Sequence, residues 1–400
     1  MTDSAIPPRV LLGPGPSTVE PRVLAAMSRP LIGHLDPEFL RIMDDTQAML
    51  RQVLCTDNRM TFAISGTGSA GMEASIVNLV EPGDRVVVVV GGVFGQRLAE
   101  QARRNGAEVI TVQGEWGCIV DPDAVESAIA GGNTRVVAVV HAETSTGVLQ
   151  PLDQIIAAAH AQDALVIVDA VTSVGGHPVQ LDAWEVDVCY SGTQKCLSCP
   201  PGLAPISFNE RALERIKERS TPVRSWYLDV GLLEGYWGQD RAYHHTAPIS
   251  MAFALQEALR IVCEEGLEAR YLRHRRHHLA LVAGVEAMGL QMQVADPGHR
   301  LWSLNAIRVP EGVDEARVRR HLLMRYGIEI GGGLGPLAGQ IWRIGLMGSS
   351  STENNVLLVL GALEAALVEQ DRPAPPGAGV AAAITALNVT PEETSGDKSP

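Results

Sequence analysis

The sequence of 400 residues predicts an α/β protein: a large domain with a mostly parallel sheet covered by helices, then a smaller C-terminal α+β domain. Three observations predict this class. Runs that are apolar at every position alternate with amphipathic stretches between about residues 60 and 210, as expected for strands buried on both faces of a sheet. Near residue 250 this alternation gives way to long helical patterns. Hydrophobic residues make up 46% of the chain, which is enough for large buried cores.

The elements of the large domain are expected in the following order. The predicted strands are RVVVVV (85–90), AEVITVQ (107–113), TRVVAVV (134–140), ALVIVD (164–169) and VDVCY (186–190). The predicted helices between them lie in FGQRLAEQARRNG, DPDAVESAIAGG and LDQIIAAAHAQD. Such strand–helix–strand units are right-handed and build an open sheet with helices on both sides.

The second half of the chain predicts a different arrangement. Residues 250–290 have the pattern of two long helices, and a strand, a helix, a strand and a last helix are expected between 303 and 370. We expect the RHRRHH run at 273–278 to be a solvated helix face. The predicted divisions are an N-terminal segment (1–20), a large ligand-binding domain (21–255), a small domain (256–370) and a tail (371–400). The tail is rich in Pro, Ala and Ser and is predicted to be partly disordered after one short helix.

Charge and hydropathy argue against several classes of protein. With 32 basic and 46 acidic residues, the formal net charge is −14, and such a chain repels the phosphates of nucleic acid. Its apolar runs are far shorter than the roughly 20 residues of a membrane helix. The first residues do not read as a secretory signal, so we expect a cytoplasmic protein with free thiols. Cys196 and Cys199 form a CxxC but lack two further ligands nearby, and no metal site is predicted.

Polar and glycine residues follow directly after the predicted strands. These segments are 65–71, 91–95, 141–147, 169–173 and 191–195. In open sheets of this kind, ligands bind beyond the carboxyl ends of the strands. We therefore expect the five segments to meet at one site.

Two of these segments carry ionisable groups that suit pyridoxal phosphate (PLP). Lys195, at a strand end beside a ligand site, can be desolvated, which lowers its pKa and makes its amine a nucleophile towards carbonyls. Asp169 ends a very apolar strand and needs a cation as partner. PLP enzymes use a lysine that forms a Schiff base and a carboxylate for the pyridinium nitrogen. A helix cap would explain Asp169 equally well if it stood alone.

The SGTGSAG turn at 65–71 suits a phosphate group. It opens a predicted helix, whose free N–H groups and dipole favour an anion, and Thr67 can add a hydroxyl. The turn lacks the lysine of a P-loop and does not match GxGxxG, which disfavours a nucleotide. Phe94, in GGVFGQR, is placed to stack on a ring, although ordinary packing at a helix start would also explain it.

With these motifs the chain resembles the class V aminotransferases of PLP fold type I, in particular the alanine–glyoxylate/serine–pyruvate aminotransferase group. The matching segments span about residues 11–365. They are LLGPGPS, SGTGSAGMEA, FGQR, ETSTGVLQPL, VDAVTSVGG, SGTQKCLSCPPGLAPISF, YHHTAPIS and IEIGGGLGPLAGQIWRIGLMG.

The resemblance implies a role for individual residues. Lys195 would be the Schiff-base lysine and then the base that moves a proton, Asp169 would pair with the pyridine nitrogen, and Arg343 would hold the substrate carboxylate with a main-chain group near Gly15. The other implied cofactor contacts are Thr67, Gly68 and Gln194 at the phosphate, Ser69 where some members have histidine, Phe94 and Val171 on the two ring faces, and Thr144 at the phenolic oxygen. Tyr243 and Thr246 would reach into the site of a neighbouring subunit, which implies a homodimer.

The implied reaction moves an amino group from alanine or serine to glyoxylate or another 2-oxo acid. An alternative is (S)-ureidoglycine–glyoxylate aminotransferase, because CTDNR, GTQKCLS, LEARYLRHRRHH and GPLAGQIWRIG resemble that branch. Against it, the branch has glutamine where this chain has His34 and asparagine where it has Tyr243, and those amides would match a ureido group better.

Two further classes were weighed against an aminotransferase. A cysteine desulfurase on the same fold needs a mobile, exposed cysteine, whereas CPPG after Lys195 predicts a rigid turn. A binding protein without activity is disfavoured because the lysine, aspartate, arginine and phosphate loop all occur together.

Overall fold

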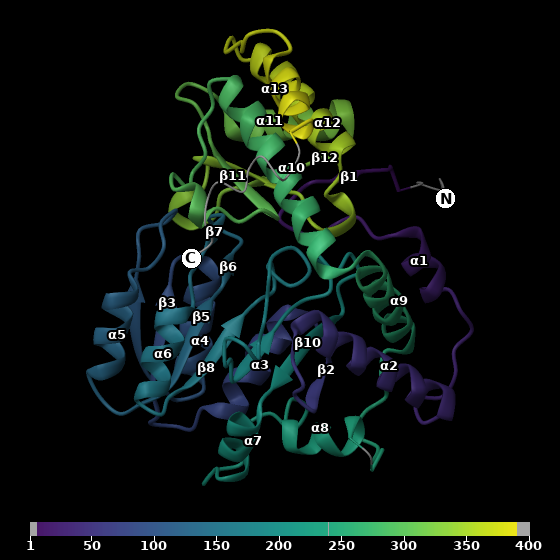
Figure 1. Cartoon of the computed structure of the whole chain (residues 1–400), viewed down its shortest axis with the longest axis vertical. Coiled ribbons are helices and arrows are strands. Elements are labelled where there is room, and N and C mark those ends of the chain that lie inside the picture. The colour runs from purple at the N-terminus through teal and green to yellow at the C-terminus, as the bar shows by residue number, and fades with distance from the viewer. Residues whose placement is uncertain (1–5, 239, 390–400) are drawn as a thin grey trace, which may run out of the picture.

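The structure is a computed structural model that describes residues 6–238 and 240–389, and it has two domains, one above the other in Figure 1. The large domain is built on a seven-stranded sheet with the order β2-β10-β9-β8-β5-β3-β4. Its strands are β2 (Met60–Ser65), β3 (Arg85–Val90), β4 (Glu108–Gln113), β5 (Thr134–Val140), β8 (Leu165–Asp169), β9 (Val188–Tyr190) and β10 (Leu203–Phe208). Only β10 runs opposite to the other strands of this sheet, so the predicted mostly parallel sheet is confirmed.

Unbroken apolar runs form these strands because both faces of the sheet are covered. In β3, Val87 and Val89 belong to one buried core, and Val86, Val88 and Val90 belong to the other. Successive side chains of a strand point to opposite faces. A strand in the middle layer therefore needs an apolar residue at every position.

Helices cover each face of the sheet. On one face lie α1 (Pro21–Met27), α2 (Pro37–Leu54), α5 (Pro122–Ala130), α6 (Asp153–Ala161) and α9 (Ile249–Glu265). On the other lie α3 (Gly68–Leu79), α4 (Val93–Arg104), α7 (Glu210–Lys217) and α8 (Val230–Trp237). A short hairpin of β6 (Ala142–Glu143) and β7 (Val148–Leu149) extends beyond the end of β5. None of the helices in the described part of the chain is long and apolar enough to cross a membrane.

The small domain has its own sheet and core. Its antiparallel sheet has the order β11-β14-β13, and the N-terminal β1 pairs with β12 beside it. These strands are β1 (Val10–Leu11), β11 (Leu304–Arg308), β12 (Ile328–Glu329), β13 (Gly331–Gly332) and β14 (Ile341–Gly345). The helices are α10 (Leu267–Ala287), α11 (Glu315–Tyr326), α12 (Glu353–Val368) and α13 (Ala378–Leu387). Helix α13 confirms the short helix predicted in the tail, and residues 390–400 lie outside the described residues.

The division of the chain near residue 255 falls inside α9. Side chains on both sides of that position, such as Leu255 and Leu259, belong to the same large-domain core. Gly266, with φ +81°, separates α9 from α10. We therefore propose that the small domain begins at Gly266.

The prediction for the RHRRHH run is wrong. His274, His277 and His278 are 0%, 6% and 3% exposed, so these histidines do not lie on a solvated face. Each has a hydrogen-bond partner: the Arg270 carbonyl, the Ser351 hydroxyl and the Asn305 side chain respectively. Polar residues are usually exposed, but a polar side chain with a partner can be buried at modest cost.

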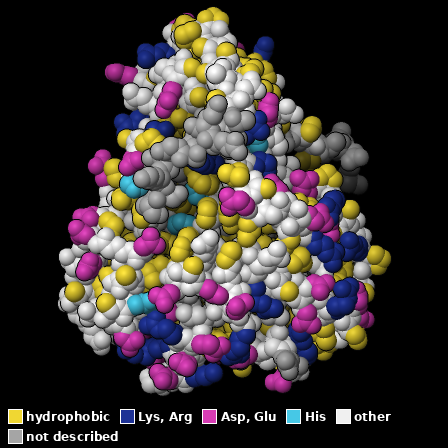
Figure 2. Space-filling view, viewed as in Figure 1, with side chains coloured by type: hydrophobic (Ala, Val, Ile, Leu, Met, Phe, Trp, Pro, Cys, Tyr) yellow, Lys and Arg dark blue, Asp and Glu magenta, His cyan; other side chains and the backbone are white. Residues whose placement is uncertain are grey.

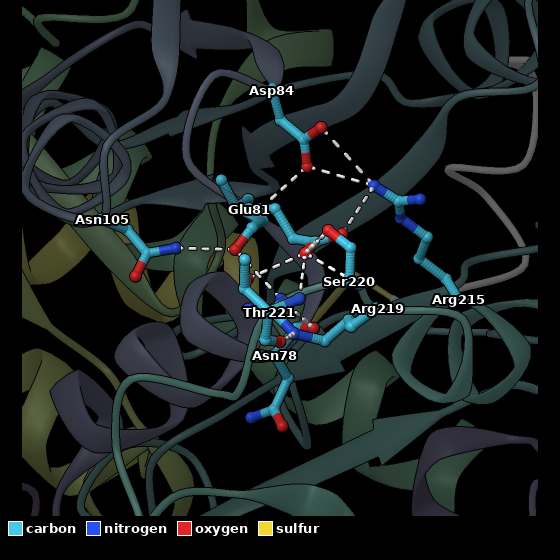
Figure 3. A network of polar contacts seen from close by, with 9 residues as sticks. Asn78, Glu81, Asp84, Asn105, Arg215, Arg219, Ser220 and Thr221 are labelled. Atoms are coloured by element: carbon cyan, nitrogen blue, oxygen red, sulfur yellow. Dashed lines mark hydrogen bonds and ion pairs between the residues drawn. The ribbon is translucent and has the colours of Figure 1, made fainter.

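A second polar cluster, which we call the Glu81 network, lies at the amino end of β3 (Figure 3). Oε1 of Glu81 accepts hydrogen bonds from the backbone N–H and the hydroxyl of both Ser220 and Thr221, all at 2.8–3.0 Å. Arg215 pairs with Asp84 at 3.2 Å and Arg219 donates to the carbonyl of Asn78 at 2.8 Å. The network fixes the loop between α7 and α8 to the end of α3.

Candidate active site

The loop after β9 holds Lys195 at the carboxyl end of the sheet, where its side chain is buried. The amine donates to the carbonyl of Pro14, and a Cβ on Gly15 would lie only 2.6 Å from Nζ of Lys195. The carbonyl of Lys195 accepts from the hydroxyl of Ser17 at 2.7 Å and from the N–H of Ser198 at 3.0 Å. Burial lowers the pKa of Lys195 to about 8, so more of the nucleophilic neutral amine is present near neutral pH than for an exposed lysine.

Asp169 ends β8, the strand next to β9, and is 3% exposed. Its carboxylate accepts from the N–H of Val171 at 2.9 Å and from the hydroxyl of Tyr190 at 2.6 Å. Burial raises the pKa of Asp169 to about 6, against the effect of these bonds and of the positive charge of Lys195. The carboxylate therefore has hydrogen-bond partners, but the positive charge around it is too small to offset its burial. Tyr190 is a site residue that the sequence reasoning missed, although its place at the end of a strand was a signal.

The turn after β2 leads directly into the N-terminus of α3, which is the candidate phosphate site. Thr67 is the N-cap, and its side chain makes no capping bond to the helix. Thr67 and Ser69 are exposed, whereas Gly68 is buried, and a Cβ there would lie 3.1 Å from Cγ2 of Val171. The Oε1 atom of Gln194, in the lysine loop, is buried without a hydrogen-bond partner among the described residues. The positive end of α3 thus lies next to the residues that follow Asp169 and β9.

Arg343 comes from the small domain and contacts the large one. It lies in β14 and is 5% exposed. Its Nε donates to the carbonyl of Gly332 at 2.7 Å and its Nη1 to the carbonyl of Thr144 at 3.0 Å. Burial lowers its pKa to about 10, with the charge of Glu143 acting in the opposite direction. Two of the five N–H donors of this guanidinium are therefore used to fix its plane.

Glu143 is a second missed residue. Its carboxylate accepts from the N–H groups of Phe94 and Gly95, which begin α4, at 3.2 and 3.3 Å, and from the hydroxyl of Ser145 at 2.5 Å. Glu143 therefore joins the start of the Phe94 helix to the segment that holds Thr144. The guanidinium of Arg97 lies 5.0 Å from the ring centre of Phe94. A carboxylate among the small residues of HAETSTG was the available signal.

Among the remaining predicted residues, His34 and Tyr243 contact each other. The rings of His34 and Tyr243 are 5.2 Å apart, and Tyr243 is 62% exposed. Thr246 is also exposed, and its neighbour His245 bonds to the hydroxyl of Ser65 at the end of β2, at 2.8 Å. None of the hydrogen bonds, ion pairs or ring contacts among the described residues joins His34, Tyr243 or Thr246 to Lys195, Asp169 or Arg343.

The cysteines near Lys195 do not suit a desulfurase. Cys196 and Cys199 are 0% and 1% exposed, and burial raises the pKa of both thiols. A thiol that attacks a substrate must be accessible and readily ionised. The described residues contain no group of three or more His, Cys, Asp or Glu side chains that could hold a metal ion.

The fold and this geometry define a class of enzyme. A buried lysine with a lowered pKa, a buried aspartate, a helix N-terminus and a buried arginine meet where the large domain faces the small one. Such a set can bond a carbonyl compound, hold an anion and orient a carboxylate.

Comparison with known proteins identifies the family. The family described as "Aminotransferase class-V" matches residues 10–348. The (S)-ureidoglycine–glyoxylate transaminase of Bacillus subtilis (strain 168) is 43% identical over 396 residues, covering 94% of this chain and 95% of that protein. The crystal structure of a B. subtilis ureidoglycine–glyoxylate aminotransferase has a TM-score of 0.94 at 44% identity, covering 97% of this chain and 100% of that one. The crystal structure of an alanine–glyoxylate aminotransferase from Nostoc sp. has a TM-score of 0.90 at 46% identity, covering 92% of this chain and 97% of that one.

The chain belongs to the class V aminotransferase family and is an aminotransferase. The predicted fold type I architecture is confirmed by these structural neighbours.

Proposed function

We propose that this enzyme uses PLP to move the amino group of alanine or serine to glyoxylate or another small 2-oxo acid. The observation that carries the proposal is the convergence of Lys195, Asp169 and Arg343 at one edge of the sheet. PLP, when bound, supplies an aldehyde that bonds amines and a ring that withdraws electrons from the bond being broken.

The residues of the site fit PLP on three observations. Asp169 is buried with a raised pKa, and a protonated ring nitrogen would supply the charge it lacks. The Gln194 amide has a buried oxygen that finds no hydrogen-bond partner in the part of the chain that the structure describes. Gly68 leaves the start of α3 close to Val171, where any side chain would crowd the cradle. Thr67, Gly68, Ser69 and Gln194 would hold the phosphate, and Phe94, Val171 and Thr144 would contact the ring.

The chain's own groups would divide the reaction as follows. The Lys195 amine would bond the aldehyde and, once released from it, would take the proton from the substrate Cα and return it to the former aldehyde carbon of PLP. Asp169 would keep the ring nitrogen protonated. Arg343 would bind the α-carboxylate with its remaining N–H groups, as its planar fork allows. Gly15, packed against the Lys195 amine, would border the substrate at the backbone.

We further propose that a homodimer completes the site. Tyr243 and Thr246 are exposed, and no hydrogen bond or ring contact among the described residues joins them to Lys195 of their own chain, which suits residues that enter a neighbouring subunit's site. Six free cysteines suit the cytoplasm, where thiols stay reduced. The face in Figure 2 intersperses acidic and basic side chains, which suits small-molecule substrates better than nucleic acid.

The paired rings of His34 and Tyr243 support a donor with a small side chain. Their ring nitrogens and hydroxyl match the donors and acceptor of a ureido group less well than the amides of glutamine and asparagine would. The similarity to the B. subtilis enzyme favours (S)-ureidoglycine as a second candidate donor.

A panel of amino donors with glyoxylate as acceptor separates the two candidates. We expect alanine or serine to give the highest kcat/KM. A higher kcat/KM with (S)-ureidoglycine would replace the first proposal by the second. No transfer from any α-amino acid would overturn both.

A further inference from the structure

Helix α10 carries buried polar side chains, among them Arg270 and His274, that take no part in the proposed reaction. Helix α9 ends at Glu265 and α10 begins at Leu267, so Gly266 lets the chain change direction between them. This places Glu265 beside the first turns of α10. Its carboxylate pairs with Arg270 at 2.5 Å and with Arg273 at 2.5 Å.

Arg270 joins the two loops that carry the reacting groups of the large domain. Its Nε donates to the carbonyl of Gly175 at 2.9 Å, in the segment that follows Asp169, and its Nη2 donates to the carbonyl of Cys196 at 2.5 Å. Cys196 is the residue after Lys195. Without Arg270, both buried carbonyls would lose a partner.

Arg273 holds the loop that follows the strand of Arg343. Its Nη1 donates to the carbonyls of Gly348 and Ser351 at 2.9 and 2.7 Å. The N–H of Gly348 in turn donates to Nε2 of His274 at 2.9 Å. The same loop also touches the lysine loop, because the N–H of Ser349 donates to the hydroxyl of Ser198 at 2.7 Å.

We propose that Glu265, Arg270 and Arg273 form a positioning unit that sets the Lys195 loop and the Arg343 strand relative to each other. Arg270 positions the loop of the reacting Lys195 amine, and Arg273 positions the loop after the strand of Arg343, which would bind the carboxylate. The side chain of Arg270 is 3% exposed. Burying a guanidinium has a large desolvation cost that its ion pair only partly offsets, and the fixed fork explains why an arginine spans two carbonyls here.

The proposal rests on the proposed function, and it predicts different kinetic effects for substitutions of Arg270 and Arg273. Arg270→Gln keeps Glu265 paired with Arg273 but loses one of the two carbonyl contacts. We expect kcat to fall by about 10- to 10²-fold, the scale for misplacing a reacting group by about 1 Å, with KM unchanged. Arg273→Gln should instead raise KM for both amino donor and acceptor. Arg276→Gln is the matched control, because Arg276 lies on the same helix but donates to the carbonyl of Leu387 in α13.

Covalent loading with PLP gives a readout that does not depend on turnover. The Lys195 amine attacks the aldehyde and water leaves, and borohydride then reduces the C=N bond, so the fixed cofactor can be counted on the Lys195 peptide. We expect loading of cofactor-free enzyme to be slowed at least about tenfold in Arg270→Gln and to be normal in Arg273→Gln and Arg276→Gln.

Two outcomes decide between positioning and stability alone. If Arg270→Gln loads and turns over like Arg276→Gln, with only a lower thermal midpoint, the positioning role is overturned. Should Arg270→Gln not fold, Glu265→Gln tests the same unit with both arginines in place, and normal loading together with normal KM and kcat would contradict the proposal. Failure of the proposed function would be visible earlier, because the wild-type enzyme would then not load PLP at all.

Discussion

Two clusters of charged side chains at opposite ends of the strands differ in how well they are satisfied. In the Glu81 network, at the amino end of β3, one carboxylate oxygen accepts four hydrogen bonds and neighbouring arginines supply positive charge. At the carboxyl end, Asp169 has two hydrogen-bond donors and a raised pKa, and Lys195 has a lowered pKa. The Oε1 atom of Gln194 has no hydrogen-bond partner within residues 6–238 and 240–389. The Glu81 network has one exception, since Nη2 of Arg219 is buried without a partner among the described residues.

The Glu81 network uses its charges to hold a loop, whereas Asp169 and Lys195 are charged groups whose partners would come from a bound ligand. A structural cluster gains stability by pairing its groups within the chain. An active site must leave some of its charge unmet, because the substrate and cofactor supply the missing partner. The pKa shifts follow this division: burial disfavours the charged forms of Asp169 and Lys195, whereas at Glu81 the effect of burial is outweighed by the hydrogen bonds from Thr221 and Ser220, which lower its pKa to about 2 and favour its charged form.

Removing Lys195 should have the largest effect on activity. Lys195→Ala should fold and bind PLP through its phosphate, while transamination falls on the order of 10⁴-fold or more, as when a covalent nucleophile is removed. The chain has only three lysines, Lys195, Lys217 and Lys398, so borohydride trapping and peptide mapping give a clear answer. Cofactor fixed to Lys217 or Lys398 in the wild-type enzyme would refute the assignment.

Arg343 should come next. Arg343→Ala should lower kcat/KM by an amount that corresponds to about 2–5 kcal/mol of transition-state stabilisation, the scale for truncating one partner of a buried charge pair. Arg343→Lys keeps the charge but not the two-point contact, so KM should rise for both donor and acceptor. Measuring the thermal midpoint and both half-reactions on one preparation tests this. A lowered midpoint with native KM values would mean that Arg343 only joins the domains.

Replacing Asp169 should lower activity but raise the stability of the cofactor-free protein. Asp169→Asn should slow turnover on the order of 10² or more, as for loss of a preorganised electrostatic group. In the cofactor-free protein, burial raises the pKa of Asp169 from its ordinary value of 3.8 to about 6. The proton therefore stabilises the fold fully below pH 3.8, and this contribution is lost as pH rises to about 6.

The corresponding measurement is thermal unfolding of cofactor-free enzyme from pH 4 to 7. A rise in the pKa from 3.8 to about 6 corresponds to at most about 3 kcal/mol in the free energy of unfolding. Asp169→Asn should lack this part of the pH dependence and be the more stable protein at pH 7. Identical pH profiles for mutant and wild type would mean that Asp169 is not destabilised in the empty site.

Much of the fold could be predicted from the sequence, because its strongest signals are local. Valine runs such as 85–90 are informative because both faces of the sheet are covered, and the alternation of strands and helices then brings Asp169 and Lys195 to one edge. Arg343 came only from resemblance, because no local pattern tells which arginine of the small domain will face the large one.

The errors came from contacts between distant segments. The polarity of 273–278 suggested a solvated helix, but α10 packs against α9, α12 and α13 and also meets the lysine loop. The hydrogen bonds that make burial affordable there come from residues such as Asn305 and Ser351, far along the chain. Glu143 and Tyr190 were missed for the same reason, since their partners lie about 49 and 21 residues away.

The smallest effect is expected at the satisfied cluster. Glu81→Gln keeps the shape and an acceptor oxygen but removes the charge, and hydrogen bonds to a charged group are stronger than those to a neutral one by about 1 kcal/mol. We expect the free energy of unfolding to fall by about 1–2 kcal/mol, with kcat, KM and covalent loading unchanged, because the network lies at the other end of the strands. Asp169→Asn, measured beside it, should show the reverse: lost activity with a gain in stability of the empty protein at pH 7. If Glu81→Gln altered KM or loading, the loop between α7 and α8 would be coupled to the site. The charges at the two ends of the sheet would then no longer be separable into anchoring and ligand-binding groups.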